Sequence, residues 1–472
     1  MFNYDTYISP FTWRYGGAEM RHIWSEEYKR KLMRRVWVAL ATAQHTAGLV
    51  TAEQLADLRA HMEEIDIPRA EEIERETRHD VMAEIRTYAE QCPVGGGIIH
   101  WGATSEDIND NVFALRMHES LAVVAQGLTA VLSALAQRME ETADLPVMAH
   151  THIQPAEPTT LGYRFAVYAQ DLLADLEEIR RLQSHLKGKG FKGAVGTQAS
   201  FVELLAGTGM DAAEMERLAM QELGLGYYLI TTQTYTRQQD VRLMNSLAGV
   251  ASSLHKLAMD FRILQSPPFG EWAEPFGRQQ VGSSAMPFKR NPINMENICS
   301  LARYVAALPG MAWDNASQAI LERSLDDSAN KRIFVAEGFL ATDEMLRRAA
   351  RVVAEMRLDE LAMQRNLATY GPFAATERVL MALVGRGADR QAGHEWIRAA
   401  SLQAWEAMRQ GLANPLVDLL AGEGEIGRYL TRTEIEELMS AEAHVGTAAQ
   451  RARAMAEWVR EASLSPFPHF FY

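Results

Sequence analysis

Residues 112–139 read VFALRMHESLAVVAQGLTAVLSALAQRM. Apolar side chains recur in this stretch, mostly three or four positions apart, at Val112, Leu115, Leu121, Val124, Leu128, Val131, Leu135 and Met139. That spacing places them on one face of a helix. A periodic run of about 28 residues is longer than the usual globular helix and is typical of a long bundle. The sequence therefore predicts an all-α fold organised around long helices.

The same periodicity predicts further helices on both sides of this stretch. Two shorter helices come first, one ending near Gly48 and one running from an N-cap at Thr51 to about Met62. Four more long helices follow, from Thr159 to about Leu186, from Arg237 to about Leu264, from Pro292 with Asn291 as N-cap, and from Asp326 to about Met356. So many long amphipathic helices have more apolar surface than one bundle buries, so we expect helix-to-helix oligomerisation.

This helical pattern divides the chain into three predicted domains. Residues 1–111 form an N-terminal helical domain, residues 112–365 a central long-helix bundle domain, and residues 366–472 a C-terminal helical domain. In the last domain we expect short helices, because Gly371-Pro372 and three later glycines interrupt the helical pattern.

Composition argues against several classes of protein. The 472 residues carry a formal net charge of −14, which disfavours a general binder of nucleic acid or of anionic membranes. Only Cys92 and Cys299 occur, which excludes a disulfide scaffold and a cysteine zinc cluster. The N-terminus lacks a signal-peptide pattern, and no apolar run approaches the ~20 residues of a membrane span. We therefore expect a cytoplasmic protein.

One loop stands out within the long-helix region, Gly282-Ser-Ser-Ala-Met-Pro-Phe-Lys-Arg-Asn-Pro292. Its glycine and two prolines interrupt any helix. It offers hydrogen-bond donors and positive charge to an anion, at Ser283, Ser284, Lys289, Arg290 and Asn291. An ordinary solvated connection is the alternative interpretation.

Five other segments combine side chains that could bind an anion or move a proton. Two lie near the N-terminus, Arg78-His79-Asp80 and the stretch His100–Asp110, which follows three glycines. The third, His150–Thr160, holds His152 in a proline-bounded loop ahead of a helix, and histidine is the natural proton carrier near neutral pH. The last two are Gln233–Arg237 and Glu322–Arg332.

Each of these segments also has a structural interpretation. Arg78-His79-Asp80 could be a solvated charge cluster, and Thr104, Ser105 and Asp107 could simply cap a helix. A lone histidine is usually structural, and a His150-x-His152 metal pair lacks a supporting cluster of further ligands. Helical arginines at 323 and 332 could pair with neighbouring aspartates instead of a phosphate or carboxylate.

Three of the motifs together resemble the fumarase/aspartase superfamily, in that family's own order. Gly282–Pro292 looks like its signature loop, Thr151–Ala156 resembles its second conserved region, and Gly102–Asp107 its first. Other segments resemble the adenylosuccinate lyase family within it, namely Arg14-Tyr15, Arg78-His79-Asp80, Gln233–Arg237 and Arg323–Arg332.

Two alternatives accompany this resemblance. Carboxymuconate cycloisomerases share a similar signature loop, but Arg14-Tyr15 and Arg323–Arg332 suit a nucleotide phosphate and weigh against them. Members of the superfamily can also serve as non-catalytic, crystallin-like structural proteins, but here the residues of the chemistry are retained.

The resemblance implies a three-domain all-α lyase with a homotetrameric helical core, shared active sites, and no metal or organic cofactor. Its substrates would be small anionic nucleotides of purine biosynthesis. The reaction would be β-elimination of fumarate from adenylosuccinate, giving AMP, and from succinylaminoimidazole carboxamide ribotide, giving AICAR. Such a reaction needs a base, a general acid and donors for a developing carboxylate charge.

The resemblance also implies a role for each matching residue. Ser283 removes the carbon-bound proton with help from Lys289, His152 protonates the leaving nitrogen, Glu296 orients His152, and His79 is a second active-site histidine. The matching substrate-binding positions are Arg14, Tyr15, Arg78, Asp80, Thr104, Ser105, Gln233, Asn291, Arg323, Ser328 and Arg332.

Three residues depart from the family pattern. His150 stands where many members have arginine, and Phe288 where histidine, tyrosine or glutamine is frequent. These two change the lining of the site more than its chemistry. Asn297 occupies a position where the animal branch tends to have a binding arginine, which leaves one anion contact open.

Overall fold

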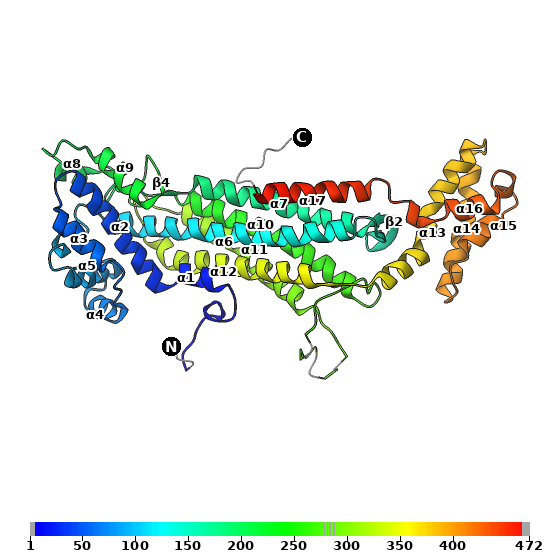
Figure 1. The fold of residues 1–472 in the computed structure, drawn as a ribbon, viewed down its shortest axis with the longest axis horizontal. Helices are drawn as coiled ribbons and strands as arrows, with labels where there is room; N and C mark the ends of the chain where they lie inside the picture. The colour runs from blue at the N-terminus through cyan, green and yellow to red at the C-terminus, as the bar shows by residue number, and fades with distance from the viewer. Residues whose placement is uncertain (1–4, 278, 281, 283–284, 287, 465–472) are drawn as a thin grey trace. The chain divides into compact units, whose positions relative to one another are not determined.

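The structure is a computed structural model that describes residues 5–277, 279–280, 282, 285–286 and 288–464. Helices make up most of the described chain, and the described strands form three two-stranded sheets (Figure 1). The predicted all-α class is therefore confirmed. The chain divides into two compact units: unit 1 comprises Met1–Leu128, Asp175–Ser252 and Ser300–Arg347, and unit 2 comprises Thr129–Ala174, Ser253–Cys299 and Arg348–Tyr472.

Five long helices match those expected from the sequence, and each contributes residues to both units. They are α6 (Ser105–Glu141), α7 (Leu161–His185), α10 (Gln238–Gln265), α11 (Ile293–Ser317) and α12 (Asp326–Glu355). The stripe that predicted α6 is buried, with Leu121, Val124 and Leu128 fully inaccessible to solvent. Helix α6 begins at Ser105, earlier than the periodic run, and the apolar spacing did not show this start because most of residues 105–111 are polar.

Helix α6 also has the length and mean hydropathy of a helix that could cross a membrane, which the sequence analysis did not anticipate. Length and composition alone make it a candidate, and 44% of its most apolar window is buried inside the chain. Core helices of globular proteins pass the same test, so this finding assigns no membrane role.

The remaining elements of unit 1 are further helices and one small parallel sheet. The helices are η1 (Pro10–Thr12), α1 (Ala18–Ile23), α2 (Glu26–Thr46), α3 (Ala52–His61), α4 (Ile67–Thr77), α5 (Asp80–Gln91), η2 (Gly96–Ile98), α8 (Ala199–Leu204) and α9 (Ala212–Leu223). Strands β3 (Lys187–Gly188) and β4 (Gly226–Tyr227) pair in parallel. The predicted N-cap at Thr51 is confirmed, and it forms a capping box with Gln54.

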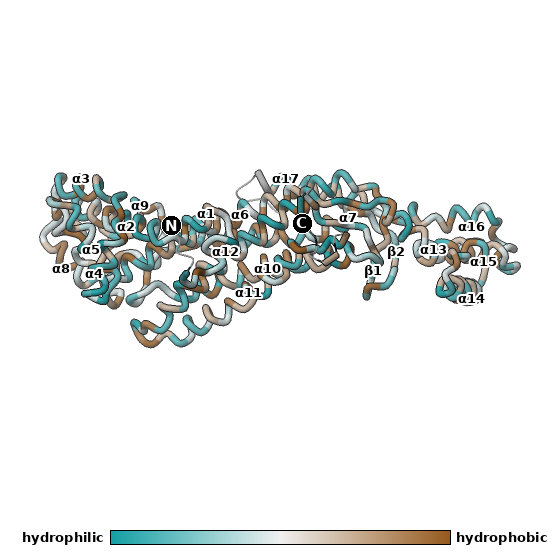
Figure 2. The backbone as a smooth tube through the Cα atoms, turned by 90° about the horizontal axis from the view of Figure 1, so that it is seen from below, coloured by the Kyte–Doolittle hydropathy of each residue, from teal (hydrophilic) through white to brown (hydrophobic). Residues whose placement is uncertain are grey.

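Unit 2 adds two antiparallel strand pairs and a helical cluster. The strands are β1 (Pro146–Thr151) with β2 (Gln154–Thr160), and β5 (Trp272–Ala273) with β6 (Arg357–Leu358). Helices α13 (Glu360–Gly385), α14 (Arg390–Arg409), α15 (Leu416–Gly422) and α16 (Arg432–Leu438), with η3 (Ile426–Arg428), enclose one apolar core. The backbones of α13 to α16 lie in one cluster (Figure 2). After η4 (Ala441–Ala443), the last helix is α17 (Ala448–Leu464).

The expectation that Gly371-Pro372 would break the helical pattern was wrong, because both residues lie inside the continuous helix α13. A proline removes one helical hydrogen bond and costs about 3 kcal/mol, which packing against neighbouring elements offsets here. Gly371 has its own reason to be there: a Cβ on it would lie 2.5 Å from Cβ of Ala441, so η4 approaches α13 closely.

The three-domain division of the sequence stays a prediction. Its boundary after residue 111 falls within α6, and the boundary after residue 365 falls within α13. Helices that continue through both points leave no linker there, so neither boundary is visible as a break in secondary structure.

Candidate active site

His152 lies at the tip of a β-hairpin, and the sequence analysis had expected only a loop around it. Strands β1 and β2 pair antiparallel up to Thr151 and Gln154, which leaves His152 and Ile153 as a two-residue turn. Both turn residues have positive φ, 54° and 61°, as in the type I′ turns that close tight hairpins. Such turns prefer Asn-Gly, because a β-branched residue is strained at positive φ.

The strained turn presents His152 to solvent. The His152 side chain is exposed, and its ring has no hydrogen-bond partner among the described residues. Strain of this kind costs of order 1–3 kcal/mol per residue and is found at functional sites. A histidine held out in this way is free to exchange a proton with a substrate.

The other hairpin histidine, His150, is partly buried and packs against a neighbouring side chain. Its ring lies edge-on to the Phe269 ring, with 5.0 Å between the centroids. Burial lowers the pKa of His150, Arg164 lowers it further, and Glu271 partly opposes both. His150, Phe269 and Arg164 also line a cavity of about 360 Å³, which Ile153 of the turn borders as well. The side chains that could hold a metal ion among the described residues do not include His150 or His152.

The predicted signature loop is partly described, and Ser283, the predicted base, lies outside the described residues together with Ser284. Its glycine has a clear steric reason: a Cβ on Gly282 would lie 2.0 Å from the carbonyl oxygen of Lys289. Asn291 Nδ2 donates a 3.3 Å hydrogen bond to the Gly282 carbonyl. The two ends of the loop are therefore held together, with the side chain of Lys289 exposed.

The helix that follows the loop begins at Ile293, and its cap differs from the expected one. Asn291 does not cap it, because the Asn291 amide is turned back to Gly282. Glu274 accepts from the backbone amides of Asn294 and Met295 at 3.2 and 2.8 Å. Glu296 then lies in the first turn with an exposed side chain that has no hydrogen-bonding partner among the described residues.

In unit 1, the predicted residues Thr104 and Ser105 lie at the start of α6, where Asp107 organises the backbone. Asp107 is fully buried and accepts from the Thr104 amide at 2.9 Å. Its other oxygen accepts from Lys189 Nζ at 2.5 Å and from the Lys192 amide at 3.0 Å. Capping does explain this part of the motif, and it also fixes the position of the two hydroxyl residues.

Two predicted binding segments meet in unit 1, although 252 positions separate them in the sequence. Arg332 Nη2 donates to Asp80 Oδ2 at 2.9 Å. Burial would raise the pKa of Asp80, but Arg332 and the Val81 amide hold it below its usual value. His79 caps α5 by accepting from the Met82 amide at 3.3 Å, and Arg78 ends α4 with a left-handed φ of 54°.

Arg323 lines a polar cavity of about 280 Å³ and forms an ion pair with Asp327 at 2.8 Å. This pairing agrees with the structural interpretation of the segment given above. It also lies 3.9 Å from Glu106. Behind it, Arg237 bonds Asp327 at 2.6 Å and Asp110 at 2.9 Å. Burial would lower the pKa of Arg237, but these carboxylates hold it well above its usual value.

Three further binding candidates are placed less specifically. The Gln233 backbone amide donates to the Glu322 carbonyl at 3.1 Å, which brings its segment beside that of Arg323. Ser328 lies in the first turn of α12, with its backbone amide bonded to Leu325. Arg14 is exposed after η1, with its guanidinium 5.9 Å from the Tyr15 ring centroid.

The candidate residues thus form two sets. Unit 1 holds the predicted substrate-binding residues around Arg323 and Arg332, together with His79. Unit 2 holds the hairpin with His152, the signature loop, Asn291 and Glu296. The role of each residue stays a prediction.

Sequence reasoning missed the buried carboxylates that hold these sets in place. Glu271 and Glu274 in unit 2, and Asp110 in unit 1, are each at most 7% exposed and each bond at least two groups. The signal available was the pair of glutamates around Trp272-Ala273, which sit in an otherwise apolar and aromatic stretch. Charged residues there need partners, because an unpaired buried charge is costly.

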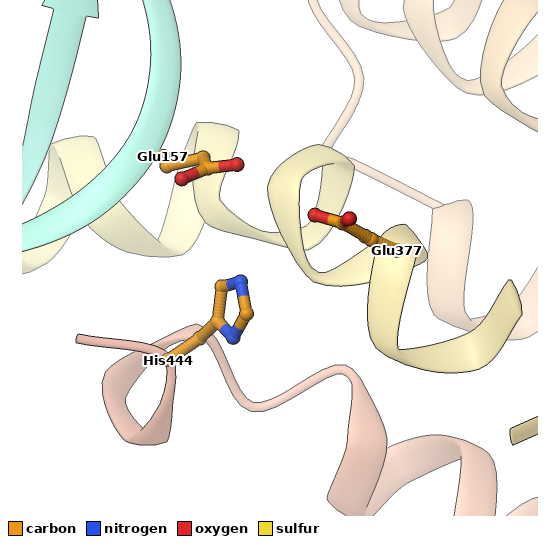
Figure 3. Close-up of side chains that lie close together, drawn as sticks. All are labelled: Glu157, Glu377 and His444. Atoms are coloured by element: carbon orange, nitrogen blue, oxygen red, sulfur yellow. The ribbon is translucent and has the colours of Figure 1, made fainter. Parts of the chain in front are cut away.

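Within the described part of the chain, one set of side chains could hold a metal ion, apart from the predicted catalytic residues. Glu157 on β2, Glu377 on α13 and His444 after η4 bring ligand atoms within 4.8 Å of one another (Figure 3). Both glutamates are exposed, and His444 is partly buried. The chemistry of carboxylate and imidazole suits zinc and related ions, but exposed acidic groups often converge without one.

Comparison with known proteins places the chain among lyases. A family described as lyase matches residues 9–307, and one described as the adenylosuccinate lyase C-terminus matches residues 372–455. The adenylosuccinate lyase of Schistosoma mansoni is 38% identical over 428 residues, covering 90% of this chain and 89% of that protein. That of Schizosaccharomyces pombe is 36% identical over 475 residues, covering 99% and 97%.

Solved structures share the fold at lower identity. A fumarate lyase from Mesorhizobium sp. BNC1 has a TM-score of 0.82 at 24% identity, covering 96% of this chain and 99% of its own. A 3-carboxy-cis,cis-muconate lactonizing enzyme from Pseudomonas putida has a TM-score of 0.83 at 23% identity, covering 95% and 99%. At this identity the likeness establishes the fold and leaves the reaction open.

Proposed function

Because the chain belongs to the adenylosuccinate lyase family of the fumarase/aspartase superfamily, we propose that it eliminates fumarate from adenylosuccinate and from succinylaminoimidazole carboxamide ribotide. It is a carbon–nitrogen lyase. The products would be AMP or AICAR, together with fumarate. The observation that carries the proposal is the exposed His152 on its strained turn, whose ring has no hydrogen-bond partner among the described residues.

The reaction breaks one carbon–nitrogen bond and one carbon–hydrogen bond. Ser283 takes the proton from the carbon next to a carboxylate, and the electron pair of that C–H bond becomes the new carbon–carbon double bond. The C–N electron pair leaves with the nitrogen, which His152 protonates. Lys289 lies within the same loop and favours both the deprotonated serine and the extra charge on the carboxylate.

Glu296 has a supporting role in this scheme. Its carboxylate stands in the first turn of α11, exposed and without a hydrogen-bonding partner among the described residues. A carboxylate beside an imidazole favours the protonated ring and fixes which nitrogen carries the proton. That is the state in which His152 can act as an acid.

Arginines of unit 1 suit the anionic parts of the substrate. Arg323 and Arg332 carry planar guanidinium groups that bind a phosphate or carboxylate in a bidentate way. Arg332 is 56% exposed while it bonds Asp80, so part of its guanidinium is open to a ligand. The proposed role of this set is to bind the nucleotide and to leave the chemistry to unit 2.

The decisive test is a direct assay of the purified protein. Adenylosuccinate should be consumed with a change in ultraviolet absorbance, and AMP and fumarate should appear in equal amounts. Turnover of a carboxymuconate without turnover of adenylosuccinate would instead support the cycloisomerase alternative. Absence of both activities would support a structural protein.

We further propose a homotetramer with shared active sites. It is supported by the superfamily resemblance and by exposed apolar side chains on the long helices, such as Val167, Met259 and Trp313. Mixing inactive His152→Ala and Ser283→Ala proteins after dissociation should restore activity if different chains supply the two residues. A molar mass from light scattering that corresponds to a monomer, or no recovery of activity on mixing, would contradict this proposal.

A cytoplasmic location is also proposed. The free cysteines Cys92 and Cys299 are both buried, and the sequence holds no other cysteine that could form a disulfide scaffold. Recovery of the protein in a secreted or membrane fraction of its source cells would contradict the proposal.

A further inference from the structure

We propose that Glu271 and Glu274 are positioning residues for the elimination: Glu271 holds the hairpin that carries His152, and Glu274 holds the helix start that carries Glu296. The two carboxylates flank the short strand β5, so one segment of four residues would set the geometry of both predicted groups. This inference rests on the proposed function. Neither glutamate touches the substrate in this scheme.

Glu271 reaches the hairpin through one arginine. Its side chain is fully buried, and Oε2 accepts from Arg164 Nη1 at 2.8 Å. The other terminal nitrogen of Arg164 donates to the Met148 carbonyl of β1 at 2.7 Å. Met148 lies on the strand that ends at Thr151, directly before the turn with His152. Glu271 therefore fixes the base of the hairpin from which His152 projects.

A second contact keeps the Glu271 carboxylate itself in place. Its Oε1 accepts from Asn366 Nδ2 at 3.1 Å, and the same Asn366 group bonds the Phe269 carbonyl at 3.0 Å. The Phe269 ring packs against His150, in β1. The hairpin is thus held at two points: Arg164, paired with Glu271, bonds the Met148 carbonyl, and the Phe269 ring contacts His150.

Glu274 acts on the other predicted group. It accepts from the Asn294 side chain at 2.7 Å and from the Asn294 and Met295 amides, the first free amides of α11. A carboxylate there satisfies donors that no helical carbonyl can reach and complements the positive end of the helix dipole. Glu296 follows Met295 directly, so its backbone position depends on this cap.

Between the two glutamates, β5 is firmly anchored. Trp272 stacks on Phe165 with 5.1 Å between ring centroids and meets Phe261 edge-on at 5.4 Å. The strand pairs with β6, and the Asp359 amide bonds the Glu271 carbonyl at 2.9 Å. A rigid support matters because displacement of a catalytic group by 1 Å can cost 10²-fold in rate.

The test is a double-mutant cycle in the full-length protein, with adenylosuccinate as substrate. Glu271→Gln should lower kcat about 10- to 100-fold and change KM less than about threefold, since binding groups are untouched. If Glu271 acts through His152, adding Glu271→Gln to His152→Ala should slow that variant no more than about twofold further. A loss equal to the product of the two single losses would overturn the proposal.

The second half of the proposal has its own cycle. Glu274→Gln by itself should lower kcat. Added to Glu296→Gln, it should lower the kcat of that variant by less than about a further twofold. Glu84→Gln is the matched control, because Glu84 is also buried and bonds Arg30 and Arg34 in unit 1. It should lower the midpoint of thermal unfolding while leaving the kcat of folded protein unchanged.

Removing only the Glu271 charge could unfold the protein, so a double variant is needed that removes both charges of the pair. Arg164→Gln with Glu271→Gln replaces both charges, so no buried charge is left alone. This pair should fold and still lose kcat, and normal kcat in it would overturn the role of Glu271. A wild-type protein that does not cleave adenylosuccinate contradicts the proposed function, whereas additive cycles in an active enzyme contradict only this inference.

Discussion

In unit 1, Arg323 and Arg332 each bond a carboxylate of the chain itself, whereas in unit 2 the side chains of His152 and Glu296 bond nothing among the described residues. The two sets of candidate residues therefore differ in how far the protein satisfies them. Groups that bind a substrate ion can be held ready by paired charges. Groups that must exchange protons need their hydrogen-bonding positions free.

The same contrast extends to the surroundings of each set. Behind Arg323, the carboxylates of Asp110 and Asp327 and the guanidinium of Arg237 form a buried network. Around His152 there is a strained and exposed turn instead. Stability in unit 1 should thus depend on charge pairing, and activity in unit 2 on the presentation of single side chains. Four experiments test this difference.

The largest effect is expected from His152→Ala, with kcat lower by about 10²-fold or more, the scale of general acid–base catalysis. KM should change little, because the binding set lies in unit 1. Steady-state kinetics with adenylosuccinate measure both, and His394→Ala, an exposed histidine of α14, is the control. Ser283→Ala should show a loss of the same size. Normal activity in either variant would contradict the assignment of that residue.

Arg237→Gln should lower the free energy of unfolding by about 3–5 kcal/mol. The variant removes the cation that joins Asp110 and Asp327, so that among the described cations Asp110 keeps only Lys331 at 3.6 Å and Asp327 only Arg323 at 2.8 Å, and breaking one side of a buried pair is costly. Urea unfolding measures the change. Arg386→Gln breaks the exposed pair with Glu434 and should cost much less, because solvent screens that pair. Equal losses in the two variants would show that burial does not set the strength of the network.

Acid should destabilise unit 1 through His100, which accepts a 3.1 Å hydrogen bond from the Trp37 indole N–H. Burial lowers the pKa of His100 to about 4, although Asp107 opposes this. Because the folded pKa lies below the unfolded one of about 6.5, the stabilisation is complete above pH 6.5 and is lost progressively towards pH 4. The difference of about 2.5 units corresponds to about 3 kcal/mol.

His100→Gln isolates that contribution, since glutamine can accept the same indole hydrogen bond without titrating. Unfolding free energies of both proteins at pH 7, 6 and 5 give the comparison. Wild type should lose more stability than the variant over this range. Parallel pH profiles would show that His100 does not titrate between the folded and unfolded states.

The long helices could be predicted because their apolar spacing repeats over many turns. The apolar residues from Leu121 to Leu135 predicted α6, and the predicted helix start at Asp326 agrees with the observed start of α12. Local signals failed where tertiary contacts decided the outcome. Pro372 predicted a helix break, yet α13 continues through it. Asn291 was predicted as an N-cap, yet the first amides of α11 bond Glu274 instead.

The candidate site was accessible from sequence only as a set of motifs. Family resemblance pointed to His152 and Arg332, but no local pattern shows that Arg332 meets Asp80 from 252 positions away. The hairpin was missed for a related reason. Its turn consists of His152-Ile153, whereas the sequence signal that predicts such a turn is Asn-Gly.

The smallest effect concerns that turn. Ile153→Gly should raise the free energy of unfolding by about 1 kcal/mol, because glycine adopts a φ of 61° without strain while isoleucine does not. Ile153 is 62% exposed, so little buried apolar contact is lost. Thr151→Gly, next to the turn but on β1, is the matched control and should lower stability, since glycine weakens a strand. If Ile153→Gly also destabilises the protein, the turn is not strained, and the presentation of His152 must depend on the hairpin base at Met148 and Arg164.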